Sequence, residues 1–381
     1  MTPQHRPAQS RRLTLSQSRR LIIKIGSALL VDPATLEIRR AWLDALADDV
    51  AQCRARGQEV LIVTSGAIAV GRTGLGLAHR PVRLEEKQAA AAVGQIRLAQ
   101  LYQETLARHD LPVGQILLTR EDTETRRRHL NARATINQLL ALGVVPVVNE
   151  NDTVTTAEIR FGDNDRLAAR VAQMISADTL VLLSDIDGLY TANPRTDPTA
   201  RHLPEITELT PEIEAMAGPP LPGMSSGGMV TKLAAARIAL AAGCRMVIAQ
   251  GHIDHPLAAI EAGARASWFL PSAEPLTARK RWIAGSVSPS GTVVVDLGAV
   301  QALRSGRSLL PAGIVAVEGT FERGDAILVR GQDGQIVARG LSAYASGDVA
   351  QLLGHKSGEI ETLLGYRGRD EIIHRDDLVV G

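Results

Sequence analysis

The sequence is poor in aromatic residues and cysteines, and each shortage excludes a class of protein. Phe, Trp and Tyr make up 3% of the 381 residues, so few rings are present on which the bases of single-stranded nucleic acids could stack. Two cysteines, Cys53 and Cys244, are too few for a disulfide framework and suit a reducing compartment. The nine histidines lack metal-ligand spacing, so we expect no metal held by the protein itself.

Long apolar runs and a strong charge of one sign are also missing. No stretch reaches the roughly 20 apolar residues that span a membrane. The net charge is +1, but residues 1–20 hold five arginines and no acid. Subtracting these five from the 42 basic residues leaves 37 against 41 acidic residues, a net −4 for the body of the chain. An acidic body lacks the electrostatic footprint of a nucleic-acid binder, and we expect neither nucleic acid nor a membrane as a partner.

The first 20 residues are polar and lack the apolar segment of a signal peptide. Their arginines and absence of acids are compatible with an organellar transit sequence as well as with a disordered tail. We favour the tail and expect a cytoplasmic protein.

What the chain does have is an alternation of short apolar runs with longer segments of helical spacing. This order predicts parallel strands joined by helices, and the nearly continuous apolar strands predict that both sheet faces are covered. We therefore expect an α/β fold, a three-layer αβα sandwich with a mainly parallel open sheet. The expected strands are 21–25, 60–63, 113–118, 144–148, 180–183 and 245–249, and the expected helices are 41–56, 84–108, 131–142, 165–175 and 231–242.

The pattern changes after about Pro271, where short strands broken by glycines replace the alternation. The turn Gln332-Asp333-Gly334 is a strong hairpin signal. We expect a first domain over 21–272, a linker over 273–287 and a small β-rich domain over 288–381.

Two predicted strands end in glycine loops suited to phosphate. Residues 24–27 place Lys24 before a glycine at the carboxyl end of a strand, where open α/β sheets bind ligands. Residues 63–67 place Ser65 before Gly66, in a turn whose backbone N–H groups can bind an anion. The alternatives are a strand-terminal lysine facing solvent and an ordinary β–α turn. Residues 66–80 are glycine-rich and are a candidate flap.

Further along, two kinds of polar motif precede helices. Residues 225–232 contain two glycines before a helix that carries Lys232 in its first turns, which favours phosphate binding over a plain flexible loop. Asn and Asp gather at 149–152 and 162–165, and Asp185 ends another strand. Helix capping is the alternative for the 162–165 segment. The run Arg126-Arg127-Arg128 is typical of a solvated helix face.

Taken together, these motifs resemble those of the amino acid kinase family, in the branch that acts on glutamate, over nearly the whole chain from about Leu21. The C-terminal part resembles a PUA domain, a fold otherwise met in RNA-modifying enzymes. The resemblance rests on VTSGAIAVG, KQAAAAVGQ, NEND, GDND, LYTANPR, GGMVTK, RKRWIAG and HRDD. It implies that ATP with Mg²⁺ phosphorylates the γ-carboxylate of L-glutamate in the first step of proline synthesis. It also implies inhibition by proline and a homo-oligomer, either a dimer or a tetramer.

Residue by residue, the resemblance implies phosphoryl transfer by Lys24 and Lys232, with Asp165 orienting both lysines. It implies glutamate binding by Ser65, Gly66, Asn149, Asp152 and Asn164. It implies nucleotide binding by Lys24, Ser184, Asp185, Ser226, Gly227, Gly228, Met229, Val230, Thr231 and Lys232. The sequence departs from the family pattern at Val230, where some members have a small polar residue, and at Ser184 and Ser226, where threonine also occurs.

Two other functions compete with this interpretation. One is a kinase of the same family for aspartate, acetylglutamate, carbamate or a nucleotide. The other is an RNA-binding protein that acts through the C-terminal domain. That domain holds nine basic and twelve acidic residues, a net −3, so RNA binding would oppose its electrostatics.

Overall fold

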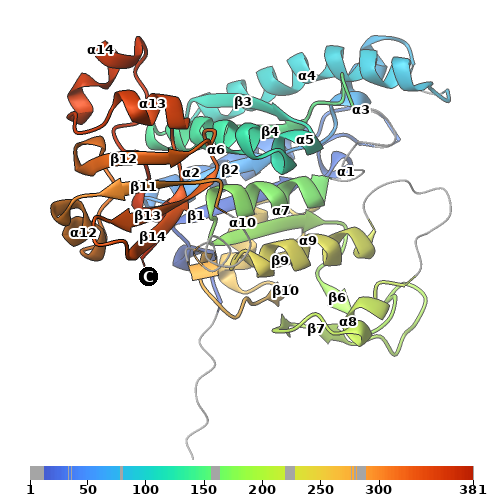
Figure 1. The fold of residues 1–381 in the computed structure, drawn as a ribbon. Helices are drawn as coiled ribbons and strands as arrows, with labels where there is room; N and C mark the ends of the chain where they lie inside the picture. The colour runs from blue at the N-terminus through green and yellow to red at the C-terminus, as the bar shows by residue number, and fades with distance from the viewer. Residues whose placement is uncertain are drawn as a thin grey trace, which may run out of the picture.

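The computed structural model describes residues 13–32, 34–35, 37–77, 80–155, 164–218, 228–275, 277–278, 280 and 289–380. Figure 1 shows a large α/β domain beside a smaller domain coloured orange to red. The large domain is built on an eight-stranded sheet in the order β3-β4-β2-β1-β5-β9-β10-β8, and the small domain on a five-stranded sheet in the order β12-β11-β13-β14-β15. None of the helices in the described ranges is long and apolar enough to cross a membrane.

The large sheet confirms the predicted parallel architecture. Every pairing is parallel except that of β10 with β9, which is antiparallel. All six predicted strands are present, whereas β10 and the two-residue β8 were not predicted from the sequence. The strands are β1 (Arg20–Ile25), β2 (Glu59–Val63), β3 (Val113–Leu118), β4 (Val145–Glu150), β5 (Thr179–Ser184), β8 (Glu205–Ile206), β9 (Arg245–Gln250) and β10 (Ala266–Phe269). A separate hairpin joins β6 (Leu189–Tyr190) to β7 (His202–Leu203).

Helices cover both faces of this sheet, because successive side chains of each strand enter opposite cores. Ile23 packs in the core beneath α2, α4 and α10, whereas its neighbour Ile22 packs in the core beneath α6, α7 and α9. This arrangement is the three-layer sandwich that the sequence predicts. The helices are α1 (Ser27–Leu30), α2 (Arg40–Ala55), α3 (Ala67–Gly74), α4 (Leu84–Ala107), α5 (Arg120–Glu124), α6 (Arg126–Ala141), α7 (Asn164–Ile175), α8 (Pro211–Ala215), α9 (Met229–Ala241) and α10 (Pro256–Ala262).

Most of the described part of the glycine-rich segment 66–80 is the helix α3, which packs closely on α4. A Cβ atom added at Gly71 would lie 1.8 Å from the carbonyl oxygen of Ala90, and one at Gly94 would lie 1.8 Å from that of Ala67. Glycine at both positions therefore permits the backbones of the two helices to touch.

The small domain has its own hydrophobic core, in which Phe321 and Tyr344 are buried. The predicted hairpin joins β13 to β14, and Gly334 in its turn has a φ of +85°. The strands are β11 (Gly291–Val295), β12 (Ile314–Gly319), β13 (Ala326–Gly331), β14 (Ile336–Leu341) and β15 (Leu378–Val380), and the helices are α12 (Leu297–Arg304), α13 (Ser346–Gln351) and α14 (Ile360–Leu364). Short 3₁₀ helices lie at Leu15–Gln17, Pro311–Gly313, Ser357–Glu359 and Arg375–Asp377.

At its N-terminal end the folded chain begins before Leu21. Leu15 is buried in the core of the large domain, and its backbone N–H donates to the carboxylate of Glu261 at 2.8 Å. Residues 13–20 thus belong to the fold, whereas residues 1–12 of the expected tail lie outside the described residues. Residues 276, 279 and 281–287 of the expected linker also lie outside them.

The two domains meet along α6, and this contact changes the interpretation of its arginine run. Arg133 donates through Nη1 to both carboxylate oxygens of Asp377, at 2.8 and 2.9 Å, and both side chains are buried. Leu130 packs against Ala326 and Leu341 of the small domain. Arg126 is half-buried and lies 3.9 Å from Asp325. The expectation of a plain solvated face was therefore wrong for Arg126, because the small domain covers this end of α6.

Candidate active site

The predicted polar motifs converge at one edge of the large sheet. Because β1, β2, β4 and β5 are parallel, their carboxyl ends lie at the same edge, where open α/β sheets bind ligands. The amino ends of α7 and α9 reach this edge as well. Lys24 lies near the end of β1, Asp165 in the first turn of α7 and Lys232 in the first turn of α9.

Asp165 stands between the two lysines. Its Oδ1 lies 2.5 Å from Nζ of Lys24, and its Oδ2 lies 3.1 Å from Nζ of Lys232. All three side chains are buried, and that of Asp165 has no exposed surface. Two ammonium groups and one carboxylate leave a net charge of +1. The trio is therefore a buried positive centre suited to an anion.

Burial acts to raise the pKa of Asp165, but the charges of Lys24 and Lys232 outweigh it and hold the pKa below its ordinary value. The carboxylate is therefore ionised at neutral pH. The hydroxyl of Thr231 lies 3.4 Å from Oδ2, but its shorter hydrogen bond, at 2.7 Å, goes to the carbonyl of Gly228. The contacts with the two lysines fix the carboxylate and, through it, the positions of both ammonium groups.

Beside this trio lies a network of amides and a hydroxyl. The side-chain nitrogen of Asn164, which carries two hydrogens, lies within hydrogen-bonding distance of three acceptors: the Thr64 carbonyl at 2.5 Å, Ser65 Oγ at 2.8 Å and Asn149 Oδ1 at 2.9 Å. Gly66 follows with a φ of +106°, a left-handed conformation that turns the chain sharply into α3. Asn164 and Asp165 are neighbours in sequence, so the amide network and the charged trio form one continuous site.

One member of this network was not predicted from the sequence. Gln95, on α4, is buried, and its Oε1 accepts a hydrogen bond from the amide of Asn149 at 2.8 Å. This bond orients Asn149 and leaves its Oδ1 free to accept from Asn164. The available signal was a polar residue within the apolar stretch AAAAVGQIRLA, at a helical position that faces the core.

On the nucleotide side the structure describes some of the predicted positions. Ser184 is buried at the end of β5 and donates to Asp185 Oδ1 at 3.2 Å, and Asp185 pairs with Arg195 at 3.0 Å. Gly228 precedes α9, Met229 packs against the core and Val230 is exposed. Ser226 and Gly227 lie outside the described residues.

The remaining predictions concern Asp152 and a bound metal. Asp152 lies half-buried in the turn that follows β4. Over the part of the chain that the structure describes, no group of three or more His, Cys, Asp or Glu side chains could hold a metal ion.

Comparison with known proteins shows which families the chain is related to. The model of the amino acid kinase family matches residues 19–250, and that of the PUA domain matches residues 291–364. A glutamate 5-kinase of Paramagnetospirillum magneticum is 64% identical over 366 residues, which cover 96% of this chain and 99% of that protein. Glutamate 5-kinase 1 of Rhizobium meliloti is 61% identical, covering 97% and 94%.

A solved structure supports the fold alone. The carbamate kinase of Giardia lamblia bound to AMP-PNP is 15% identical, with a TM-score of 0.50 over 68% of this chain and all of that one. From the family models and the close relatives, we conclude that the chain belongs to the amino acid kinase family, in the glutamate 5-kinase group, and carries a PUA domain.

Proposed function

We propose that the chain catalyses ATP-dependent phosphorylation of the γ-carboxylate of L-glutamate to L-glutamyl 5-phosphate, the first step of proline biosynthesis. The observation that carries the proposal is the buried trio of Lys24, Asp165 and Lys232 beside the amide network of Asn164. The names of the close relatives support the choice of substrate.

The chemistry suits these residues because the acceptor carboxylate is already ionised at neutral pH. No general base is needed, and the difficulty is the repulsion between two anions. Lys24 and Lys232 would contact the phosphate oxygens and neutralise the charge that develops on the leaving group. Asp165 would hold both ammonium groups in place, so that donor and acceptor meet in line.

The other predicted residues divide between the two substrates. The 13-residue helix α9 directs the positive end of its dipole toward the site, which favours the phosphates of ATP. We assign glutamate binding to Ser65, Gly66, Asn149, Asp152 and Asn164. We assign nucleotide binding to Ser184, Asp185, Ser226, Gly227, Gly228, Met229, Val230 and Thr231, together with the two lysines.

Mg²⁺ fits the site when it is carried by the nucleotide. The described residues include no acidic cluster that would hold the ion, and the carboxylate of Asp165 is engaged by two lysines. Phosphate oxygens and water would therefore be its main ligands, as is usual for this ion. When bound, Mg²⁺ supplies further positive charge at the transferred phosphoryl group.

A hydroxylamine-trapping assay tests the proposed reaction directly. The chain is incubated with Mg·ATP and, separately, with L-glutamate, L-aspartate, N-acetylglutamate or no acceptor. We expect a hydroxamate with L-glutamate alone, because hydroxylamine captures an acyl phosphate. A hydroxamate from another acid would refute the assigned substrate, and none from any acid with folded protein would refute the reaction.

Gln95 provides a test of the assigned glutamate site. Replacing it with leucine removes the acceptor that orients Asn149 and leaves a buried amide N–H without its partner, which costs about 1–3 kcal/mol. We expect Gln95→Leu to raise the KM for L-glutamate about tenfold or more, with a smaller change in the KM for ATP.

Gln301→Leu, at an exposed glutamine on α12 of the PUA domain, is the matched control. Equal KM values for L-glutamate in the Gln95→Leu and Gln301→Leu variants would contradict the assignment.

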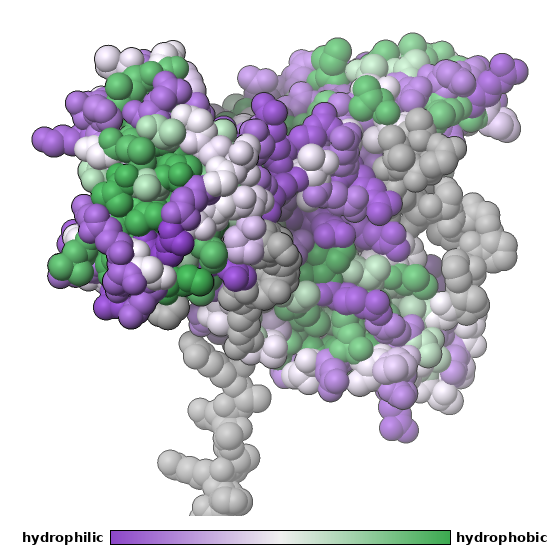
Figure 2. All heavy atoms as spheres, viewed as in Figure 1, coloured by the Kyte–Doolittle hydropathy of each residue, from purple (hydrophilic) through white to green (hydrophobic). Residues whose placement is uncertain are grey.

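We also propose that the chain forms a homo-oligomer through α4. The side chain of Ile96 is 72% exposed, and Val93, one turn earlier, is 38% exposed. Figure 2 shows hydrophobic residues interspersed with polar ones along this helix, at the upper right. Exposed apolar side chains grouped in this way are typical of an interface between subunits.

Two further proposals concern an inhibitor and a cellular location. We propose proline as an inhibitor, because proline retains the α-carboxylate and the amino nitrogen of glutamate and could occupy part of the same site. We also propose a cytoplasmic location, supported by two cysteines that are both free and buried.

A further inference from the structure

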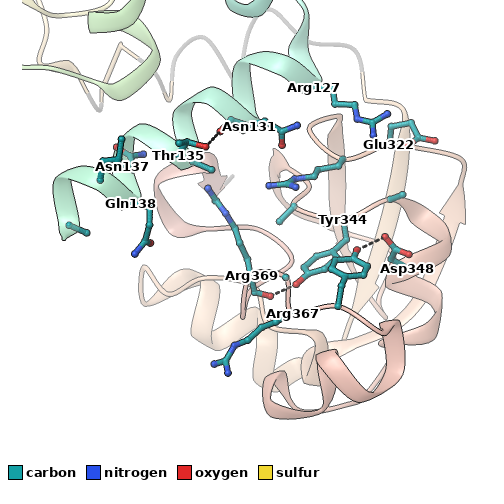
Figure 3. Close-up of a pocket in the computed structure, with 18 residues that line it drawn as sticks. Arg127, Asn131, Thr135, Asn137, Gln138, Glu322, Tyr344, Asp348, Arg367 and Arg369 are labelled. Atoms are coloured by element: carbon teal, nitrogen blue, oxygen red, sulfur yellow. Dashed lines mark hydrogen bonds between the residues drawn. The ribbon is translucent and has the colours of Figure 1, made fainter. Parts of the chain in front are cut away.

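A cavity of about 1030 Å³ lies at the boundary between the two domains. Figure 3 shows one wall formed by α6, with Asn131, Thr135 and Gln138, and the opposite wall formed by the PUA domain. The opposite wall consists of the segments 322–323, 343–345 and 366–369 together with Asp348. None of the residues assigned to the kinase reaction lines this cavity.

Four arginines line the cavity, and they come from both domains. Arg127 belongs to α6, whereas Arg323, Arg367 and Arg369 belong to the PUA domain. The lining holds two acids, Glu322 and Asp348, so its formal charge is +2.

These guanidinium groups are poorly neutralised. In the described ranges of the chain, no carboxylate pairs within 4.0 Å with Arg127, Arg323 or Arg367. Arg369 is at the 4.0 Å limit from Asp377, which Arg133 already binds at shorter distance.

The two arginines next to Arg127 in the sequence do have acidic neighbours. Arg126 lies near Asp325 of the PUA domain, and Arg128 pairs with Glu121 at 2.8 Å. Of the three, Arg127 alone lines the cavity, and no acidic residue among those described pairs with it. Like charges that face each other from two domains repel, and an anion between them would turn that repulsion into attraction.

We propose that this cavity binds a small phosphate compound with two or more negative charges, which bridges α6 and the PUA domain. A guanidinium group matches phosphate oxygens with two parallel hydrogen bonds, and several such groups suit several phosphoryl oxygens. The polar side chains of α6 would bind the remainder of the ligand. Figure 3 shows Arg369 reaching from the PUA domain toward α6, across the space that the ligand would fill.

Size and charge favour a small ligand over a nucleic acid. The cavity is at the upper end of the range of about 300–1,000 Å³ found for small-molecule sites. A polymer would extend beyond the four arginines over a domain with a net charge of −3, where its phosphates would be repelled.

Calorimetric titration of the full chain with inorganic pyrophosphate tests the proposal. The variants are Arg323→Gln/Arg367→Gln on the PUA side, Arg127→Gln on the α6 side, and Arg304→Gln as the matched control, an exposed arginine of the PUA domain outside the cavity. Each of these substitutions removes a positive charge at an exposed position, so all three variants should fold. Lys232→Met is titrated as well, because pyrophosphate can also bind at the proposed active site.

We expect that binding at the cavity persists in Lys232→Met and is unchanged in Arg304→Gln, whatever further binding occurs at the proposed active site. The double variant should weaken it about tenfold or more, and Arg127→Gln by a smaller factor, because each lost guanidinium removes a charged hydrogen bond. Pyrophosphate binding equal to that of the unaltered chain in the double variant would overturn the proposal. So would binding that disappears only in Lys232→Met, or a structured RNA that binds more tightly than pyrophosphate through the same arginines.

Discussion

Replacing Lys232 with methionine should lower kcat at least about a hundredfold, and Lys24→Met should do the same. The reason is the charge of the trio, which is +1 with both lysines ionised and Asp165 negative. Either substitution brings the sum to zero and removes a donor from the phosphoryl group. Loss of one such contact at a transition state typically costs roughly 3 kcal/mol. Steady-state kinetics with L-glutamate and Mg·ATP gives the result.

Two further variants separate this role from a general loss of structure. Lys356→Met, at an exposed lysine of the PUA domain, should leave kcat unchanged. Asp165→Asn raises the charge of the trio to +2 yet should also lower kcat, because the two ammonium groups then repel each other and lose their common anchor. Thermal unfolding of each variant establishes that it is folded. A folded Lys232→Met protein with normal kcat would refute the assigned role.

Of the substitutions proposed, breaking the ion pair that joins Arg133 on α6 to Asp377 in the PUA domain should produce the largest loss of stability. Arg133→Met leaves Asp377 buried without the guanidinium that binds both its oxygens. Removing one partner of a buried ion pair typically costs about 3–5 kcal/mol. We expect this loss in the free energy of unfolding of the full chain, measured by urea denaturation, and faster hydrogen exchange in β15.

The control for this prediction is Arg375→Gln, which removes an exposed arginine from the same turn as Asp377. It should change the free energy of unfolding by less than about 0.5 kcal/mol. The double substitution Arg133→Met/Asp377→Leu should recover much of the loss, because it leaves no buried charge unpaired. Equal stability of Arg133→Met and Arg375→Gln would show that the domains are held together by other contacts.

The large sheet and its long helices α2, α4, α6, α7 and α9 were predictable because their signals are local, whereas the short helices α5 and α10 were not predicted. Six apolar runs became strands of one sheet, and three of the helices are followed by glycines with φ of +75° to +80°, at Gly57, Gly143 and Gly243. The edge strand β8 and its neighbour β10 each contain a polar residue, Glu205 and Ser267, so neither forms an unbroken apolar run. The helix α3 was not expected because glycines disfavour helices, and here close packing on α4 overrides that preference.

The candidate site was predicted in part for the same reason. Residues at the ends of parallel strands must gather at one edge, which brings Lys24, Ser65 and Asn149 near one another. Their bonding partners could not be predicted in this way. Gln95 lies 54 positions from the asparagine that it orients, and a single polar residue in a helix carries no sign of its partner.

By itself, then, the sequence determined the layers of the fold, the place of the candidate site and the relationship to a kinase family, since strand patterns, helix patterns and short motifs each act over a few residues. Only the tertiary structure decided how the site is held and how the domains join. Arg133 and Asp377 are 244 positions apart, and Arg127 meets its fellow arginines only where the PUA domain covers α6. Such contacts depend on the packing of whole elements, which no local pattern encodes.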